Sequence, residues 1–149
     1  MSPIKTTPCL LILLVLSAAI QSEARWGKTR VEIHNTIGPG VDLTVHCKSK
    51  DDDIGEQLLH FNDSFGFNFR PRFFFGGTLF FCSFKWGSEF KYFDVYDEDR
   101  DSDICHYCVW NIVPSGPCLL KEDSADDYHC FEWNKSENQK FGSLPANPN

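Results

Sequence analysis

The cysteines are the most reactive residues of this sequence. Their spacing decides between redox activity, zinc binding and structural disulfides. Cys9 lies in an apolar N-terminal run, and six others follow later in the chain: Cys47, Cys82, Cys105, Cys108, Cys118 and Cys130. Cys105 and Cys108 form a Cys-x-x-Cys pair, which can be redox-active or bind zinc in a reducing compartment. A zinc site would need a second pair at a matching distance, and the sequence has none. In an exported chain, six cysteines predict three structural disulfides instead.

Carboxylates at alternating positions form a second group, made of Asp97, Asp99, Asp101 and Asp103. A calcium loop of the EF-hand type also places oxygen ligands at alternating positions. Here Ser102 stands where that loop needs glycine, and Cys108 stands where it needs a bidentate glutamate. The pattern therefore favours a solvated loop between two strands. Because such loops carry specificity on rigid β-scaffolds, we predict that these four aspartates contact a partner.

Five histidines raise the question of acid–base catalysis, as in a hydrolase or a ribonuclease: His34, His46, His60, His106 and His129. Two histidines can act as general acid and base, but no motif for a nucleophile or a metal accompanies these. The net charge of -7 also disfavours nucleic acid, because phosphate binding needs a basic surface. We predict a protein that is not an enzyme and has no metal or cofactor, and we keep the secreted hydrolase as an alternative.

Two Asn-x-Ser sequons are candidate glycosylation sites. Asn62 precedes an aromatic segment and is expected in a turn, and Asn134 is expected at the edge of a C-terminal tail.

The N-terminus has the pattern of a secretory signal. Lys5 precedes a run of about 12 apolar residues, and Ser22 and Ala24 form a small-x-small cleavage site. The run is short of the roughly 20 residues that span a bilayer, so no membrane insertion is predicted. We expect a signal peptide at residues 1–24 and a secreted, extracellular protein.

The remaining chain alternates apolar and polar residues with the period of β-strands. This pattern occurs at residues 31–35, 42–48, 65–70, 90–96 and 109–113, while residues 78–84 are apolar on both faces and predict a strand covered on each side. Glycine, proline and aspartate separate the segments, as at Asp51–Asp53 with Gly55. The sequence predicts an all-β domain over residues 25–133, a sandwich or a barrel, and a disordered tail over 134–149.

Several segments resemble the plant self-incompatibility S1 family, also called the S-protein homologues. They are VEIHN at 31–35, LTVHCKSKDDDIG at 43–55, TLFFC at 78–82, FDVY at 93–96, CVWNI at 108–112 and GPC at 116–118. The resemblance covers residues 31–133 and implies a small disulfide-stabilised antiparallel β-sandwich secreted by plants. Members with four cysteines exist, so the extra cysteines here leave the pairing open. Our hypothesis is Cys47–Cys118, Cys82–Cys108 and Cys105–Cys130.

The resemblance also implies a function. The best-studied members look like secreted ligands that a cell-surface receptor recognises during rejection of self pollen. We therefore predict a monomeric signalling ligand that binds a receptor protein through its loops, in pollen–pistil recognition or other cell–cell communication. A carbohydrate-binding module is a further alternative. It requires that at least one of Tyr92, Trp86 and Trp133 is exposed beside polar groups.

Overall fold

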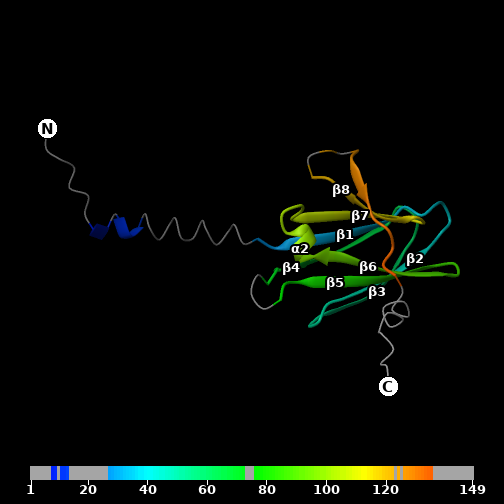
Figure 1. The fold of residues 1–149 in the computed structure, drawn as a ribbon, viewed down its shortest axis with the longest axis horizontal. Coiled ribbons are helices and arrows are strands. Elements are labelled where there is room, and N and C mark those ends of the chain that lie inside the picture. Colours follow the sequence, from blue (N-terminus) through cyan, green and yellow to red (C-terminus); the bar gives the residue numbers. More distant parts are fainter. Residues whose placement is uncertain are drawn as a thin grey trace, which may run out of the picture.

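The computed structural model is a sandwich of two β-sheets, which confirms the all-β prediction (Figure 1). It describes residues 8–9, 11–13, 27–72, 76–122, 124 and 126–135. The first sheet contains, in spatial order, β4 (Ser64–Phe69), β1 (Thr29–Asn35), β7 (Tyr107–Val113), β8 (Gly116–Leu120) and β9 (Tyr128–Cys130). The second contains β3 (Asp53–Leu59), β2 (Leu43–Lys48), β5 (Leu79–Trp86) and β6 (Glu89–Asp97). A short helix, α2 (Glu98–Asp101), follows β6.

The termini are described only in part. Most of the predicted signal peptide lies outside the described residues, as do residues 136–149 of the predicted tail. No helix in the described part of the chain is both long and apolar enough to cross a bilayer. Asn134, which we assigned to the tail, instead donates its backbone N–H to the Tyr92 carbonyl, at 2.9 Å.

The antiparallel prediction holds for every strand pair but one. β1 pairs with β4 antiparallel on one side and with β7 parallel on the other, with Ile33 opposite Trp110. Parallel neighbours need a long crossover connection. Here the chain supplies it by forming the whole second sheet between β1 and β7.

The alternation of apolar and polar residues did not predict three of the strands, β3, β8 and β9. β3 begins with Asp53 and contains Gly55, which has a positive φ of 86°, so its pattern resembles a turn. β8 contains Pro117, and β9 has only three residues, all exposed. Pairing with neighbouring strands, more than side-chain pattern, creates these three strands.

The prediction that residues 78–84 are covered on both faces is wrong. Phe80, Cys82 and Phe84 of β5 are buried, but Leu79 and Phe81 on the other face are 44% and 39% exposed. β5 is interior within its sheet, yet nothing that the structure describes covers its outer face.

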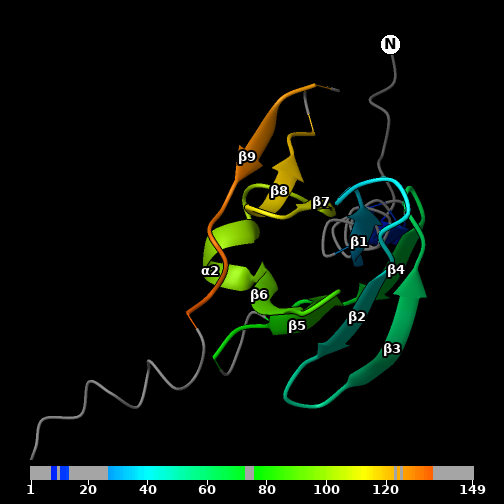
Figure 2. The same cartoon turned by 90° about the vertical axis from the view of Figure 1, so that its right-hand side faces the viewer.

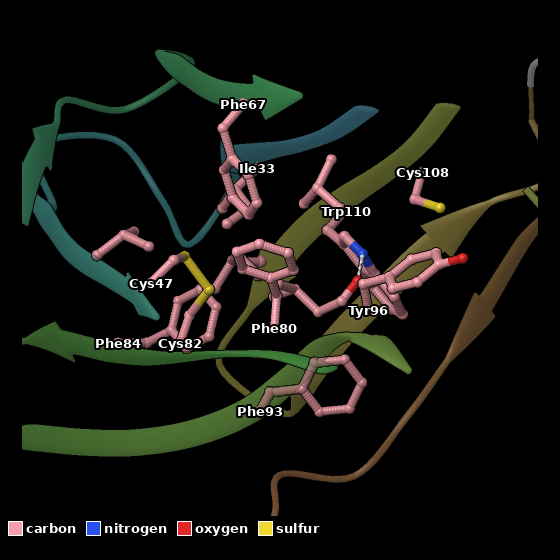
Figure 3. Close-up of a cluster of buried hydrophobic side chains, with 14 of the residues drawn as sticks. Ile33, Cys47, Phe67, Phe80, Cys82, Phe84, Phe93, Tyr96, Cys108 and Trp110 are labelled. Atoms are coloured by element: carbon pink, nitrogen blue, oxygen red, sulfur yellow. Dashed lines mark hydrogen bonds between the residues drawn. A yellow bond between two sulfur atoms is a disulfide. The ribbon is translucent and has the colours of Figure 1, made fainter. Parts of the chain in front are cut away.

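Large aromatic side chains fill the space between the sheets (Figure 3). Trp110 is fully buried, its ring lies 5.0 Å from that of Phe93, and its indole N–H donates to the Val95 carbonyl at 2.8 Å. This bond satisfies the one polar atom of the indole and links the two sheets, because Trp110 lies on β7 and Val95 on β6.

All six later cysteines form disulfides, but each of our predicted pairs is wrong. The bonds are Cys47–Cys82, Cys105–Cys108 and Cys118–Cys130. Two of them join residues directly opposite each other on neighbouring strands, β2 with β5 and β8 with β9. The third closes the Cys-x-x-Cys pair on itself, because the turn before β7 brings the two Cα atoms to 5.2 Å.

The segment after β9 closes one side of the sandwich, and we call residues 131–134 the C-terminal strap (Figure 2). It leaves the first sheet with the Phe131 N–H bonded to the Pro117 carbonyl, and it reaches β6 of the second sheet at Asn134. On the way Trp133 packs against Phe84 and Trp86, at ring distances of 5.3 and 5.7 Å.

The strap depends on Gly116, the first residue of β8. A Cβ atom added at Gly116 would lie 1.9 Å from the Phe131 carbonyl oxygen, and the φ of 153° is one that other residues rarely adopt. We expect Gly116→Ala to lower the free energy of unfolding by about 2–3 kcal/mol, because it combines overpacking with backbone strain. Urea unfolding measures the loss, with Gly38→Ala, in open space at a negative φ, as the control. Equal stabilities of the two variants would contradict the assignment.

Candidate recognition surface at the α2 end of the sandwich

Three connections gather at one end of the sandwich: the β2–β3 turn, the β4–β5 connection and α2 (Figure 1). Glu98 links two of them, because its backbone N–H donates to the Thr78 carbonyl and its carboxylate accepts the Thr78 N–H at 2.6 Å. The guanidinium of Arg72 donates to the Asp51 carboxylate at 3.0 Å and links the β4–β5 connection to the β2–β3 turn. We call this group of connections the α2 end.

A groove of about 970 Å³ lies beside these contacts. Its lining combines exposed charged residues, Lys50, Arg70 and Asp52, with the apolar side chains of Ile54 and Leu79. Such a mixture can hold an extended segment of a partner through both apolar and charged contacts.

The side chain of Arg100 fixes α2 to the core. It donates to both carboxylate oxygens of Asp101 at 2.6 Å and to the Asp94 carbonyl at 2.7 Å. Its guanidinium lies 5.1–5.3 Å from the ring centres of Phe93, Trp110 and Phe131. A bidentate ion pair held over aromatic rings is a rigid arrangement, so the loop after β6 has a defined shape.

The predicted contact loop therefore divides into structural and exposed residues. Asp101 is fully buried and accepts the Asp97 N–H as well as Arg100, so our prediction that it contacts a partner is wrong. Asp97 is the N-cap of α2, where its carboxylate accepts the Asp99 N–H at 3.0 Å. Of the four aspartates, Asp99 and Asp103 are exposed, and their side chains do not take part in holding the loop together.

Sequence reasoning missed Arg100 and Glu98, which hold the α2 end together. Both lie inside a run of charged residues that resembles a solvated loop, so their residue types gave no signal of burial. The apolar residues on either side of the run, Val95 and Cys105, are the one clue that the connection returns to the core.

Comparison with known proteins explains this architecture. The family model for plant self-incompatibility protein S1 matches residues 30–133. The chain belongs to this family. It is 47% identical to S-protein homolog 5 of Arabidopsis thaliana over 108 residues, which are 72% of this chain and 80% of that protein. It is 43% identical to S-protein homolog 4 of the same plant, over 76% of this chain and 78% of the relative.

A solved structure shares the fold of this S1-family chain. It comes from self-incompatibility protein homologues, described as a widespread family of small, highly stable, secreted proteins from plants. The TM-score is 0.53 at 18% identity, covering 72% of this chain and 96% of the solved one. As a member of this family, the protein is secreted.

The histidines of this S1-family chain do not converge on one site within the part that the structure describes. Three of them pair with separate surface carboxylates: His34 with Glu32, His46 with Asp53 and His60 with Asp42, at 3.0, 2.6 and 2.8 Å. The hydrogen bond from His46 lowers the pKa of Asp53 to about 2.

The remaining two histidines are exposed, whereas His34 and His46 are half-buried. His106 lies before β7, and His129 of β9 packs its ring 4.6 Å from that of Phe131. Among the described residues, no group of three or more His, Cys, Asp or Glu side chains could hold a metal ion. No observation favours the hydrolase alternative.

The two sequons lie away from the α2 end. Asn62 is exposed in the β3–β4 turn, at the opposite end of the sandwich, with a positive φ of 70°. Asn134 is half-buried in the C-terminal strap. A glycan on Asn62 would leave the groove and α2 uncovered, so the prediction of glycosylation there is compatible with recognition at the other end.

Proposed function

We propose that this protein is a secreted signalling ligand that binds a cell-surface receptor through the α2 end. The observation that carries the proposal is the pair of exposed carboxylates, Asp99 and Asp103, held in a fixed position by the buried Arg100–Asp101 pair. A rigid loop binds with little loss of conformational entropy, which favours specific recognition. The groove beside it adds a concave surface for a segment of the receptor. Pollen–pistil recognition, or another form of cell–cell communication, is the process that the family suggests.

The test is a binding measurement on cells with two charge-matched variants. Fluorescently labelled protein is applied to pollen tubes or protoplasts, and binding is followed by flow cytometry or imaging. We expect saturable binding and a loss of affinity of about five- to tenfold in Asp99→Asn/Asp103→Asn, because contact carboxylates are removed while the fold remains. The control, Asp42→Asn/Glu89→Gln, removes two exposed carboxylates at the opposite end.

Two results would contradict the proposal. Saturable binding that is unchanged in Asp99→Asn/Asp103→Asn would place recognition elsewhere on the protein. An equal loss in both double variants would show that only net charge matters, and it would remove the α2 end as the specific surface.

A further inference from the structure

The outer face of the four-stranded sheet carries aromatic side chains in contact with solvent. Phe81 of β5 is 39% exposed, and Phe90 and Tyr92 of β6 are 53% and 36% exposed. The rings of Phe90 and Tyr92 meet edge to face at 5.0 Å. Phe81 lies diagonally from Tyr92, because the register places Phe81 opposite Asp94 and Ser83 opposite Tyr92. Contiguous exposed apolar patches mark binding sites, whereas single exposed apolar residues are normal, so three neighbouring rings need an explanation.

Each ring is paired across the two strands with a side chain that can form hydrogen bonds. The three pairs are Phe81 with Asp94, Tyr92 with Ser83, and Phe90 with Lys85. We call these six residues the aromatic face. Within the part of the chain that the structure describes, the side chains of Ser83, Lys85 and Asp94 make no hydrogen bond or ion pair. Their hydrogen-bonding capacity is thus available to a ligand.

The other sheet shows that the fold does not require such a surface. The outward side chains of β1 are Arg30, Glu32 and His34, and Glu32 is bonded to both of the others. A sandwich needs only one apolar face on each sheet, and the outer face of the first sheet is largely polar. The exposed ring of Tyr107 on β7 is engaged there, because its hydroxyl donates to the Glu32 carboxylate and the Arg30 guanidinium lies over the ring. The rings on β5 and β6 are therefore additional to what packing demands.

We propose that the aromatic face binds a neutral oligosaccharide. A pyranose ring offers an apolar C–H face that stacks on an aromatic ring and an edge of hydroxyl groups that donate and accept hydrogen bonds. The aromatic face presents the complementary arrangement, with Tyr92 beside Ser83 and the Asp94 carboxylate nearby. Lys85 and Asp94 carry opposite charges, so the surface has no net charge to attract a polyanion or a polycation. This site is separate from the α2 end, except that Phe81 also lines the groove.

The test is titration of the isotope-labelled mature chain with cellohexaose, xylohexaose and mannohexaose, followed by amide chemical shifts. We expect at least one of these neutral sugars to bind and to shift amides of β5 and β6. Tyr92→Ala should weaken that binding by about tenfold or more, as loss of a central aromatic contact does. Asp94→Ala should weaken it too, without removing a ring. Tyr128→Ala, which removes a 41% exposed ring on β9, is the matched control and should bind as the parent does.

Specific outcomes would overturn the proposal. They are no binding of any of the three sugars, equal binding by the parent and the Tyr92→Ala and Asp94→Ala variants, or, in a parallel titration with an oligogalacturonate, binding of that anionic sugar alone. Self-association of the chain that is lost in Tyr92→Ala would assign the face to a second copy instead. Thermal unfolding of each variant confirms that it folds. Asp99→Asn/Asp103→Asn should bind the sugar normally, so the receptor proposal and this one fail separately.

Discussion

Replacing Arg100 with alanine is expected to lower the free energy of unfolding by about 3–5 kcal/mol, the usual cost of removing one partner from a buried ion pair. Asp101 is fully buried, and both of its carboxylate oxygens accept hydrogen bonds from Arg100. Without the guanidinium, the Asp97 N–H is the one donor left to this buried carboxylate among the residues that the structure describes. The substitution also removes the guanidinium that contacts the rings of Phe93, Trp110 and Phe131.

Chemical denaturation of three variants separates the contributions to this effect. Arg72→Ala is the control, because Arg72 also pairs with an aspartate but is 72% exposed, and exposed pairs contribute about 0–1 kcal/mol. Arg100→Lys keeps the charge and loses the bidentate geometry, so it should fall between the parent and Arg100→Ala. If Arg100→Ala unfolds at the same denaturant concentration as Arg72→Ala, the buried pair does not stabilise the loop after β6.

This arrangement explains why the acidic loop was interpreted only in part from the sequence. Alternating carboxylates correctly placed a connection between two strands, but the prediction of a solvated loop was wrong, because the connection contains α2, in which Glu98 and Asp101 are buried. They could not show that Asp101 turns inward while Asp99 and Asp103 remain outside. That choice depends on the aromatic cluster contributed by β6, β7 and the strap, which forms only when distant segments of the chain meet.

The strands, too, were predicted from the sequence only in part. Period-two alternation predicted β1, β2, β4, β6 and β7, because each of these strands buries one face and its sequence pattern reflects that burial. It misjudged β5, where Leu79 and Phe81 are apolar but exposed. An apolar residue on a strand indicates a buried position only where its role is to pack in the core. On β5 and β6 the exposed rings are better explained by binding, so the error in the fold prediction is also the observation behind the proposed sugar site.

The disulfides were paired wrongly because the hypothesis was made without knowing which strands are neighbours. We expected Cys105 and Cys108 to bond to different partners and Cys47 to reach Cys118. Pairing instead follows strand order, since β2 and β5 are neighbours although 35 residues separate their cysteines. Strand order could not be obtained from the sequence, because β3 and β8 were not recognised as strands.

The second large effect concerns the Cys47–Cys82 disulfide, whose loss is expected to lower the free energy of unfolding by about 4 kcal/mol. In the loop-entropy model a cross-link stabilises more as the closed loop lengthens, and this bond spans 35 residues. The Cys105–Cys108 bond spans three residues, so its removal should cost only about 1.5 kcal/mol. The comparison uses Cys47→Ala/Cys82→Ala and Cys105→Ala/Cys108→Ala in residues 25–149, measured by urea unfolding.

Thiol titration of the same two variants tests the pairing itself. With the bonds as the structure has them, removing Cys47 and Cys82 leaves the other four cysteines paired, and the denatured variant contains no free thiol. Under the pairing hypothesised from the sequence, the same variant would leave Cys108 and Cys118 without partners and would show two. Free thiols in the Cys47→Ala/Cys82→Ala variant, or a greater loss of stability in Cys105→Ala/Cys108→Ala, would contradict the structure. Cys47 and Cys82 are both fully buried between the sheets, and because their bond closes the longest of the three loops, we expect it to contribute more to stability than either of the other two disulfides.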